Sequence, residues 1–262
     1  QPNPGQKTAC CGGNVHRIFP NYAIRMWMKT ADGGLAAVLY GPSTVTARVG
    51  DGGSLVRIVQ TTDYPFRERI EFNISAERPV AFPLALRVPG WCSAPRLEID
   101  GKPVPAVRDD KGFIVLRRTF TPGERIALTL PMKLAVTHWP QNGIGIERGP
   151  IVYSLPVSEW NYGLAIDPER LESEVLIKNI PGPVPGSVIA PWENPPVTLS
   201  VPVRKIEGWE LQANPDKPEQ KFTPPLPDLS LNRPAGEVER VSLVPYGSTQ
   251  LRLTVFPAVP RG

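Results

Sequence analysis

The stretch "GFIVLRRTFTPGERIALTLPM", residues 112–132, decides the fold. Two runs of mainly apolar and β-branched residues flank Pro122-Gly123, and such runs are typical of strands. Proline and glycine together mark a sharp turn, because proline fixes φ and glycine accepts conformations that other residues avoid. The stretch therefore predicts two β-strands joined at Pro122-Gly123.

The same strand pattern extends on both sides of this stretch, from Leu35 onward. Residues 69–75 alternate the apolar Ile70, Phe72 and Ile74 with polar residues. Residues 84–91 place apolar side chains on one face, and residues 96–104 form a strand, an Asp-Gly turn and a second strand. Short strands with regular turns are typical of a β-sandwich, which we place at residues 31–134.

A second set of strands begins near Leu134, so we place a domain boundary at residues 133–140. We predict a strand led by Gly149-Pro150, a strand at 197–204, and a final hairpin at 238–257 turning at Tyr246-Gly247. Residues 181–234 hold 13 of the 33 prolines, which predicts loops. The fold class is thus mainly β, with a second, jelly-roll-like sandwich at 135–262 whose final hairpin could return to the first.

Residues 14–29 are the one stretch with helical spacing. Apolar side chains recur every three or four residues, from Val15 through Phe19 and Tyr22 to Trp27, and Asn14 suits an N-cap. Pro20 would kink this helix or restart it. A short helix with a broad apolar stripe is marginal alone, so we expect weak anchoring unless a partner covers it.

The bulk composition excludes some classes of partner. The net charge is +4 and the pI is about 9.0, but the basic residues are scattered among acids, so no nucleic acid partner is indicated. No apolar run is long enough to cross a membrane. Three cysteines cannot supply a disulfide framework.

Two of these cysteines, Cys10 and Cys11, are adjacent and come just before the predicted helix. A helix N-terminus favours the thiolate, which is the nucleophilic and metal-binding form. Gly12-Gly13 would let a ligand approach the backbone, and Lys7, His16 and Arg17 add positive charge. The residues alone leave two interpretations open: a thiolate site, or two buried cysteines that fill space.

The other candidates are weaker. The first acidic residue is Asp32, so this segment lacks both a carboxyl acid/base and the four ligands of a closed zinc site. Cys92 is a minor candidate for a further ligand. His16 and His138 fit packing or surface positions, and the sequon at Asn73 falls in a predicted strand. Sugar stacking is a secondary possibility for the tryptophans Trp91, Trp139, Trp160, Trp192 and Trp209.

The cysteine segment "ACCGGNVHRIFPNYAIRMWM" resembles that of glycoside hydrolase family 127, formerly a domain of unknown function, whose members include β-L-arabinofuranosidases. The resemblance continues in the family's order through "LALRVPGWC", "FIVLRRTFTPGERIALTLPM", "IERGPIVYSLPV" and "VSLVPYGSTQLRLTVFP". It implies an N-terminal (α/α)6 barrel followed by two β-sandwiches. Residues 1–30 would then be the last segment of that barrel.

The resemblance also implies a chemistry. Cys10 would be the nucleophile of a retaining mechanism, and Cys10 and Cys11 would bind zinc with an upstream cysteine and glutamate. The acid/base glutamate would also precede Gln1. We therefore expect a partner, the barrel, and a plant-type oligo- or polysaccharide as substrate of the whole enzyme. This chain alone would bind zinc weakly and be inactive. The alternative is a non-catalytic sandwich module that binds carbohydrate or protein, and the cellular location is not indicated.

Overall fold

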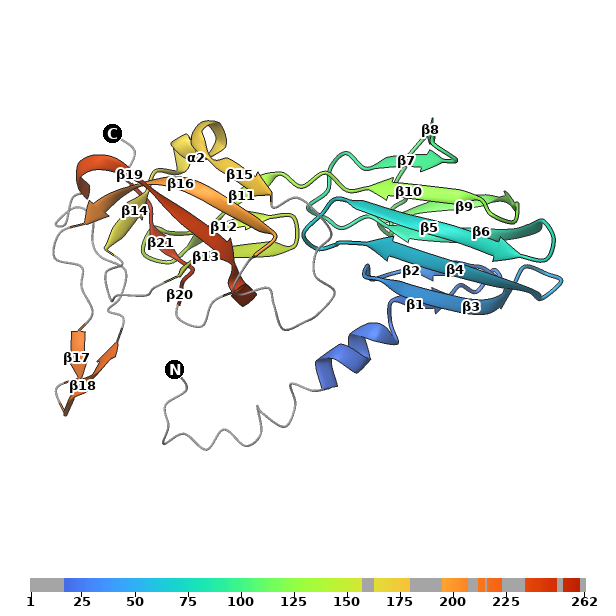
Figure 1. Cartoon of the computed structure of the whole chain (residues 1–262), viewed down its shortest axis with the longest axis horizontal. Helices are drawn as coiled ribbons and strands as arrows, with labels where there is room; N and C mark the ends of the chain where they lie inside the picture. The colour runs from blue at the N-terminus through green and yellow to red at the C-terminus, as the bar shows by residue number, and fades with distance from the viewer. Residues whose placement is uncertain are drawn as a thin grey trace. The chain divides into compact units, whose positions relative to one another are not determined.

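The computed structural model describes residues 17–156, 163–179, 195–206, 212–214, 216–222, 234–248 and 252–259. The chain divides after Met132 into two compact units, which are described separately (Figure 1). Helical segments in the described ranges are residues 17–23, α2 (Pro168–Glu174) and the 3-10 turn η1 (Tyr246–Ser248). The predicted mainly β fold class is therefore confirmed. None of the described helices has the length and apolarity needed to cross a bilayer.

The first unit is a sandwich of two sheets. The four-stranded sheet has the order β1-β2-β6-β9, and the six-stranded sheet has the order β3-β4-β5-β10-β7-β8. Only β2 and β6 pair in parallel; the other neighbours are antiparallel. The strands are β1 (Trp27–Lys29), β2 (Leu35–Ala37), β3 (Ser43–Val49), β4 (Ser54–Thr62), β5 (Arg69–Ala76), β6 (Val80–Arg87), β7 (Arg96–Ile99), β8 (Lys102–Val104), β9 (Phe113–Phe120) and β10 (Arg125–Thr129).

The alternating pattern of the sequence defines the core of this sandwich. Ile70, Phe72 and Ile74 of β5 are almost fully buried, while the polar residues between them face outward. Leu84 and Leu86 of β6 are equally buried and belong to the same apolar cluster. The Asp-Gly turn between β7 and β8 also forms as predicted, with both residues at positive φ (48° and 76°), as a tight hairpin requires.

The two strands around Pro122-Gly123 lie in different sheets. The turn therefore carries the chain across the sandwich from β9 to β10, and the two strands do not form a hairpin. Glu124 stabilises this corner from a buried position: one carboxylate oxygen accepts hydrogen bonds from the Thr121 amide and hydroxyl, both at 3.0 Å. The other carboxylate oxygen pairs with Arg118 at 3.1 Å. Hydrogen bonds thus compensate for burying a charge.

The second unit is built on one nine-stranded network with the central order β11-β12-β13-β19-β16-β14. Strand β15 pairs with β16, β20 with β13 and β21 with β12, and β17 and β18 form a separate ribbon. The strands are β11 (Leu134–Trp139), β12 (Gly143–Arg148), β13 (Ile151–Pro156), β14 (Leu164–Ile166), β15 (Leu176–Asn179), β16 (Val197–Ile206), β17 (Gln212–Asn214), β18 (Lys217–Phe222), β19 (Pro234–Pro245), β20 (Arg252–Leu253) and β21 (Phe256–Pro257).

The predicted final hairpin at 238–257 is wrong. Strand β19 ends at Pro245, and its neighbours in the sheet are β13 and β16. Strand β13 pairs with Val244 and Pro245, the two positions at which a hairpin turning at Tyr246-Gly247 would begin to pair. The chain after η1 pairs instead with β13 as β20 and with β12 as β21, inside the second unit.

The predicted helix at 14–29 is too long. In the described residues it covers 17–23, and β1 begins at Trp27. Trp27, Met28 and Lys29 pair with Ala37, Ala36 and Leu35 of β2. The helical spacing of Met26 and Trp27 is real, but pairing with the sandwich overrides it, since local propensity is a weak determinant of structure.

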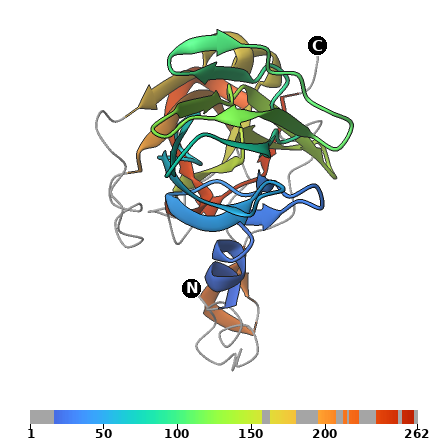
Figure 2. The same cartoon turned by 90° about the vertical axis from the view of Figure 1, so that its right-hand side faces the viewer.

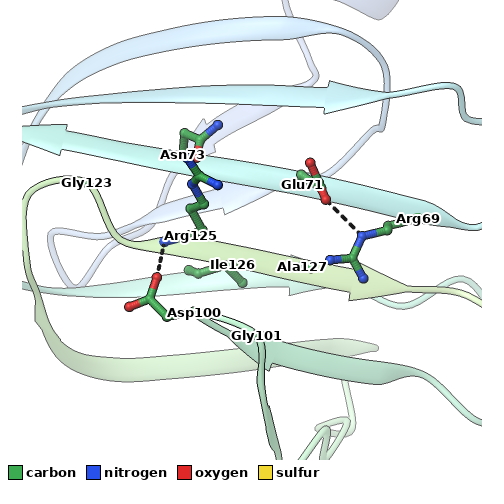
Figure 3. A pocket seen from close by; sticks show the side chains of 9 residues that line it. All are labelled: Arg69, Glu71, Asn73, Asp100, Gly101, Gly123, Arg125, Ile126 and Ala127. Carbon is green, nitrogen blue, oxygen red and sulfur yellow. Dashed lines mark hydrogen bonds and ion pairs between the residues drawn. The ribbon is translucent and has the colours of Figure 1, made fainter. Parts of the chain in front are cut away.

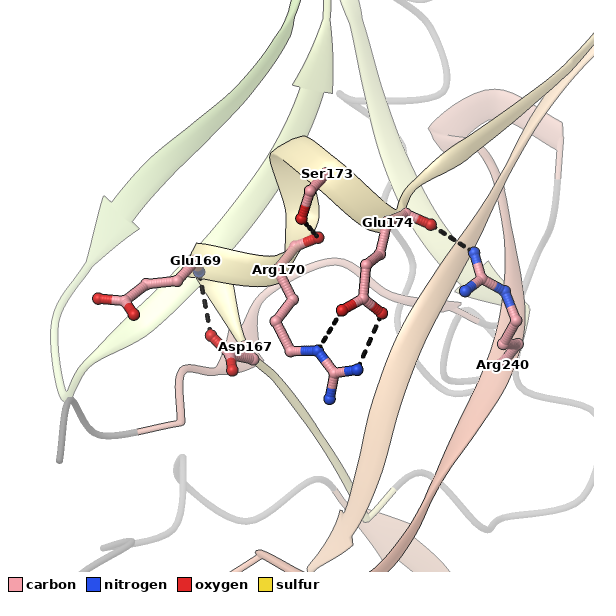
Figure 4. A network of polar contacts seen from close by, with 6 residues as sticks. All are labelled: Asp167, Glu169, Arg170, Ser173, Glu174 and Arg240. Atoms are coloured by element: carbon pink, nitrogen blue, oxygen red, sulfur yellow. Dashed lines mark hydrogen bonds and ion pairs between the residues drawn. The ribbon is translucent and has the colours of Figure 1, made fainter.

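An unpredicted polar network joins α2 to the second unit's sheet (Figure 4). Asp167 caps α2 by accepting a hydrogen bond from the Glu169 amide at 3.0 Å, and Arg170 pairs with Glu174 one turn later. Arg240 of β19 donates to the Glu174 carbonyl at 2.6 Å and to the Ser200 carbonyl at 2.9 Å. One guanidinium thus holds the helix end against β16.

Candidate functional site

The predicted catalytic and zinc-binding residues Cys10 and Cys11 lie outside the described residues, as do the neighbouring Lys7 and His16. The structure therefore does not test their roles. It does describe the helix that follows them and the contacts that hold this helix. These contacts show how the first unit holds the helix.

The helix at 17–23 exposes only part of the apolar stripe that the sequence predicts, because Met26 of that stripe is buried and Trp27 is half-buried. Ile24 was not part of the predicted spacing. Ile18 and Phe19 are 62% and 65% exposed, and Ile24 just beyond the helix is 71% exposed. Figure 2 shows the helix extending away from the sheets of the first unit rather than lying on one of them. Exposed large apolar side chains grouped in this way mark an interaction surface. We name Ile18, Phe19 and Ile24 the apolar stripe.

The C-terminal end of this helix is fastened to the sandwich. The Tyr22 hydroxyl donates to the Tyr40 carbonyl at 2.8 Å, and Met26 is buried. The Met26 carbonyl accepts from the Val38 amide at 2.9 Å, and the Trp27 indole donates to Ser43 Oγ at 3.2 Å. The helix is thus exposed to solvent along most of its length, but hydrogen bonds hold the end that leads into β1.

An aromatic cluster lies beneath this attachment. The Tyr40 ring meets the edges of Tyr64 and Phe72 at centroid distances of 5.7 and 6.4 Å, and its hydroxyl donates to the Arg87 carbonyl. Burial raises the pKa of Tyr40 and of Tyr22 above the usual range and raises the pKa of Tyr64 to about 12. These hydroxyls stay protonated at neutral pH, so they do not act as general bases. Those of Tyr22 and Tyr40 act as hydrogen-bond donors that hold the structure.

We predict that Tyr22→Phe will loosen the helix without unfolding the first unit. The substitution removes one hydrogen bond, worth about 1 kcal/mol, and keeps the ring. Exchange of the Ile24 amide, which donates to the Pro20 carbonyl, should quicken by about fivefold. Tyr246→Phe in the second unit, where the ring lies under Arg252, is the matched control. Equal exchange in Tyr22→Phe and the parent would show that the hydroxyl does not fasten the helix.

The remaining predicted candidates are scattered. Cys92 is buried in the core of the first sandwich, where burial raises the pKa of its thiol. His138 is exposed on β11. In the described part of the chain, no three or more His, Cys, Asp and Glu residues group as a metal site would need. Trp91 packs half-buried against the first core and Trp139 is 54% exposed, whereas Trp160, Trp192 and Trp209 lie outside the described residues.

A polar hollow on the outside of the six-stranded sheet was not predicted (Figure 3). It has a volume of about 490 Å³. We name it the outer groove, and the residues that line it are Arg69, Glu71, Asn73, Asp100, Gly101, Gly123, Arg125, Ile126 and Ala127. The only sequence signal was the polar half of the alternation in 69–75, which by itself indicates a solvent-facing side.

The first unit matches the model of a known protein family. Residues 34–132 match the family model described as β-L-arabinofuranosidase, GH127 middle domain. Over these residues the first unit is similar to a GH127 middle domain. The match runs from the residue before β2 to the end of the first unit and includes both strands around Pro122-Gly123. It confirms the resemblance that the sequence motifs indicated.

Solved structures extend the likeness beyond the GH127 middle domain. A GH127 β-L-arabinofuranosidase from Geobacillus stearothermophilus T6 matches 96% of this chain with a TM-score of 0.69 and 21% identity. A GH127 β-arabinofuranosidase matches 97% of it (TM-score 0.68, 16% identity), and a protein described as a glycoside hydrolase matches 88% (0.61, 20%). The TM-scores, with 88–97% of the chain covered, show a shared fold.

The chain spans 38%, 37% and 38% of the lengths of these three proteins. No curated protein sequence matches the chain significantly.

Proposed function

We propose that this chain is the β-rich, C-terminal part of a glycoside hydrolase that releases terminal β-L-arabinofuranosyl or related sugars. The observation that carries the proposal is the match of residues 34–132 to the GH127 middle domain. The likeness of both units to GH127 arabinofuranosidases supports it. Fold alone does not fix an activity, so the reaction must be argued from the cysteine segment.

In this proposal Cys10 is the nucleophile, and Cys10 and Cys11 hold a zinc ion. Two thiols suit zinc chemically, and a closed site needs about two further ligands, which in this proposal come from the catalytic domain. Bound zinc would keep the thiols deprotonated at neutral pH. Cys10 would attack the anomeric carbon with retention of configuration overall. The carboxyl that protonates the leaving oxygen would come from outside this chain.

The described residues supply a reason for a further domain. The apolar stripe is exposed, yet the helix that carries it is fastened at one end to the first unit. A catalytic (α/α)6 domain packed on Ile18, Phe19 and Ile24 would bury this surface. The first unit would then act as a rigid base for the segment that carries Cys10. A plant-type oligo- or polysaccharide is the substrate expected for the whole enzyme.

An activity assay in two forms of the protein tests this proposal. Residues 1–262 alone should not hydrolyse an aryl β-L-arabinofuranoside, because in this proposal the catalytic domain supplies the acid/base carboxyl. The longer protein, with its catalytic domain, should release the aryl group and retain the anomeric configuration. Robust hydrolysis by residues 1–262 would place the acid/base in this chain and overturn the division of roles. An inactive but folded longer protein would favour the alternative, a non-catalytic sandwich module.

A further inference from the structure

We propose that the outer groove of the first unit binds a neutral saccharide. This inference does not rest on the proposed catalysis, because the groove lies wholly on described residues of one sheet and is tested by binding. Figure 3 shows its polar side chains gathered over β5, β10 and the turn after β7.

The strand register explains why a hollow forms here. On the outer face, Ala127 of β10 lies between Glu71 of β5 and Glu98 of β7. Ala127 is buried beneath these longer neighbours and is one of the residues that line the groove. At one end Gly101 and Gly123 line the groove without side chains, and a Cβ added at either would meet nothing within 4 Å. The hollow is therefore open to a ligand of small-molecule size.

The polar groups in the groove are only partly used by the protein. Arg69 is occupied, since it pairs with Glu71 at 2.9 Å and with Glu98 at 3.2 Å. Arg125 lies opposite Asn73 in the register, and its guanidinium has no hydrogen-bond or ion-pair partner within the described ranges. Asp100 Oδ1 accepts from the Arg125 backbone amide at 2.9 Å, which leaves its second oxygen available. The groove thus offers a ligand both a hydrogen-bond donor, Arg125, and an acceptor, Asp100.

The balance of charges selects the ligand class. Two arginines and two carboxylates line the groove, so its formal charge is zero and neither an anion nor a cation is favoured. A sugar hydroxyl both donates and accepts, and neighbouring hydroxyls on a ring would use the Arg125 and Asn73 donors together with the Asp100 acceptor. No aromatic ring lines the groove. Without such a platform, the expected dissociation constant is on the order of millimolar.

Titration of the isotope-labelled 262-residue chain by NMR tests the proposal, with arabinotriose, xylotriose and cellotriose as neutral probes. At least one should shift the amides of Gly101 and Gly123, with saturation at tens of millimolar. Arg125→Gln should weaken that binding about tenfold, because it removes the unpaired charged donor. Arg57→Gln is the matched control: Arg57 is exposed on the same outer face, opposite Ser75, but does not line the groove.

The outcomes separate clearly. Saturable shifts that weaken in Arg125→Gln and persist in Arg57→Gln support a neutral saccharide site. An absence of shifts with all three probes, or equal weakening in both variants, overturns it. Trigalacturonate is the charged comparison: if it binds and the neutral probes do not, the groove is an anion site and the proposal is wrong. Because hydrolysis is not measured, none of these results depends on the catalytic proposal.

Discussion

Replacing Gly34 with alanine should destabilise the first unit by about 3 kcal/mol, a large effect for one methyl group. A Cβ on Gly34 would lie 2.2 Å from the Pro83 carbonyl oxygen and 2.7 Å from Thr30 Oγ1. The Pro83 oxygen belongs to the backbone of β6, which pairs directly with β2 beside Gly34. Neither strand can move away without breaking that parallel pairing. The midpoint of urea unfolding, followed for the first unit, measures the loss.

Gly90→Ala is the matched control, because a Cβ there would meet no atom within 4 Å. Its unfolding midpoint should stay close to that of the parent, or rise slightly through the lower entropy of the unfolded chain. If Gly34→Ala unfolds at the same urea concentration as Gly90→Ala, the close approach of β2 and β6 is not rigid. The apolar stripe would then rest on a weaker base than we infer, since the helix is attached next to β2.

The sequence predicts strands better than it predicts their partners. Strand β5 and the β7–β8 hairpin could be predicted because burial alternates with period two and Asp100-Gly101 needs positive φ. The sequence could not predict that β9 and β10 lie in opposite sheets. A Pro-Gly turn between two apolar runs fits both a hairpin and a crossing from one sheet to the other. The hydrogen bonds of the buried Glu124 stabilise the crossing, but in the sequence Glu124 looks like an ordinary charged turn residue.

The candidate sites show the same limit. Ile18 and Phe19 of the apolar stripe were predictable from helical spacing, whereas Ile24 lies outside that spacing. The fastening of the helix was not predictable, since Tyr22 binds a backbone carbonyl at Tyr40 and carbonyls carry no sequence signal. The outer groove joins residues near 70, 100 and 125, which become neighbours only through strand register. The roles of Cys10 and Cys11 come from family resemblance, and they stay predictions.

In the longer protein with its catalytic domain, Cys10→Ser should lower turnover by roughly three orders of magnitude or more. A serine hydroxyl is far less ionised than a thiolate at neutral pH, so it is a poor nucleophile in the same position. Both substitutions remove a proposed zinc ligand, so zinc content should fall in both variants. In Cys11→Ser activity should fall only in proportion to the zinc that is lost. The measurement is hydrolysis of an aryl β-L-arabinofuranoside, with metal analysis of each purified variant.

Cys92→Ala controls for the loss of any thiol, because Cys92 is buried in the core of the first sandwich. It should keep its zinc and its activity, although its unfolding free energy should fall modestly. Cys10→Ser that binds zinc normally and turns over at the parent rate would contradict the nucleophile assignment. Restoring zinc to Cys11→Ser at high metal concentration should restore activity in proportion, whereas added zinc should leave Cys10→Ser inactive. That contrast separates a nucleophile from a ligand at two adjacent cysteines.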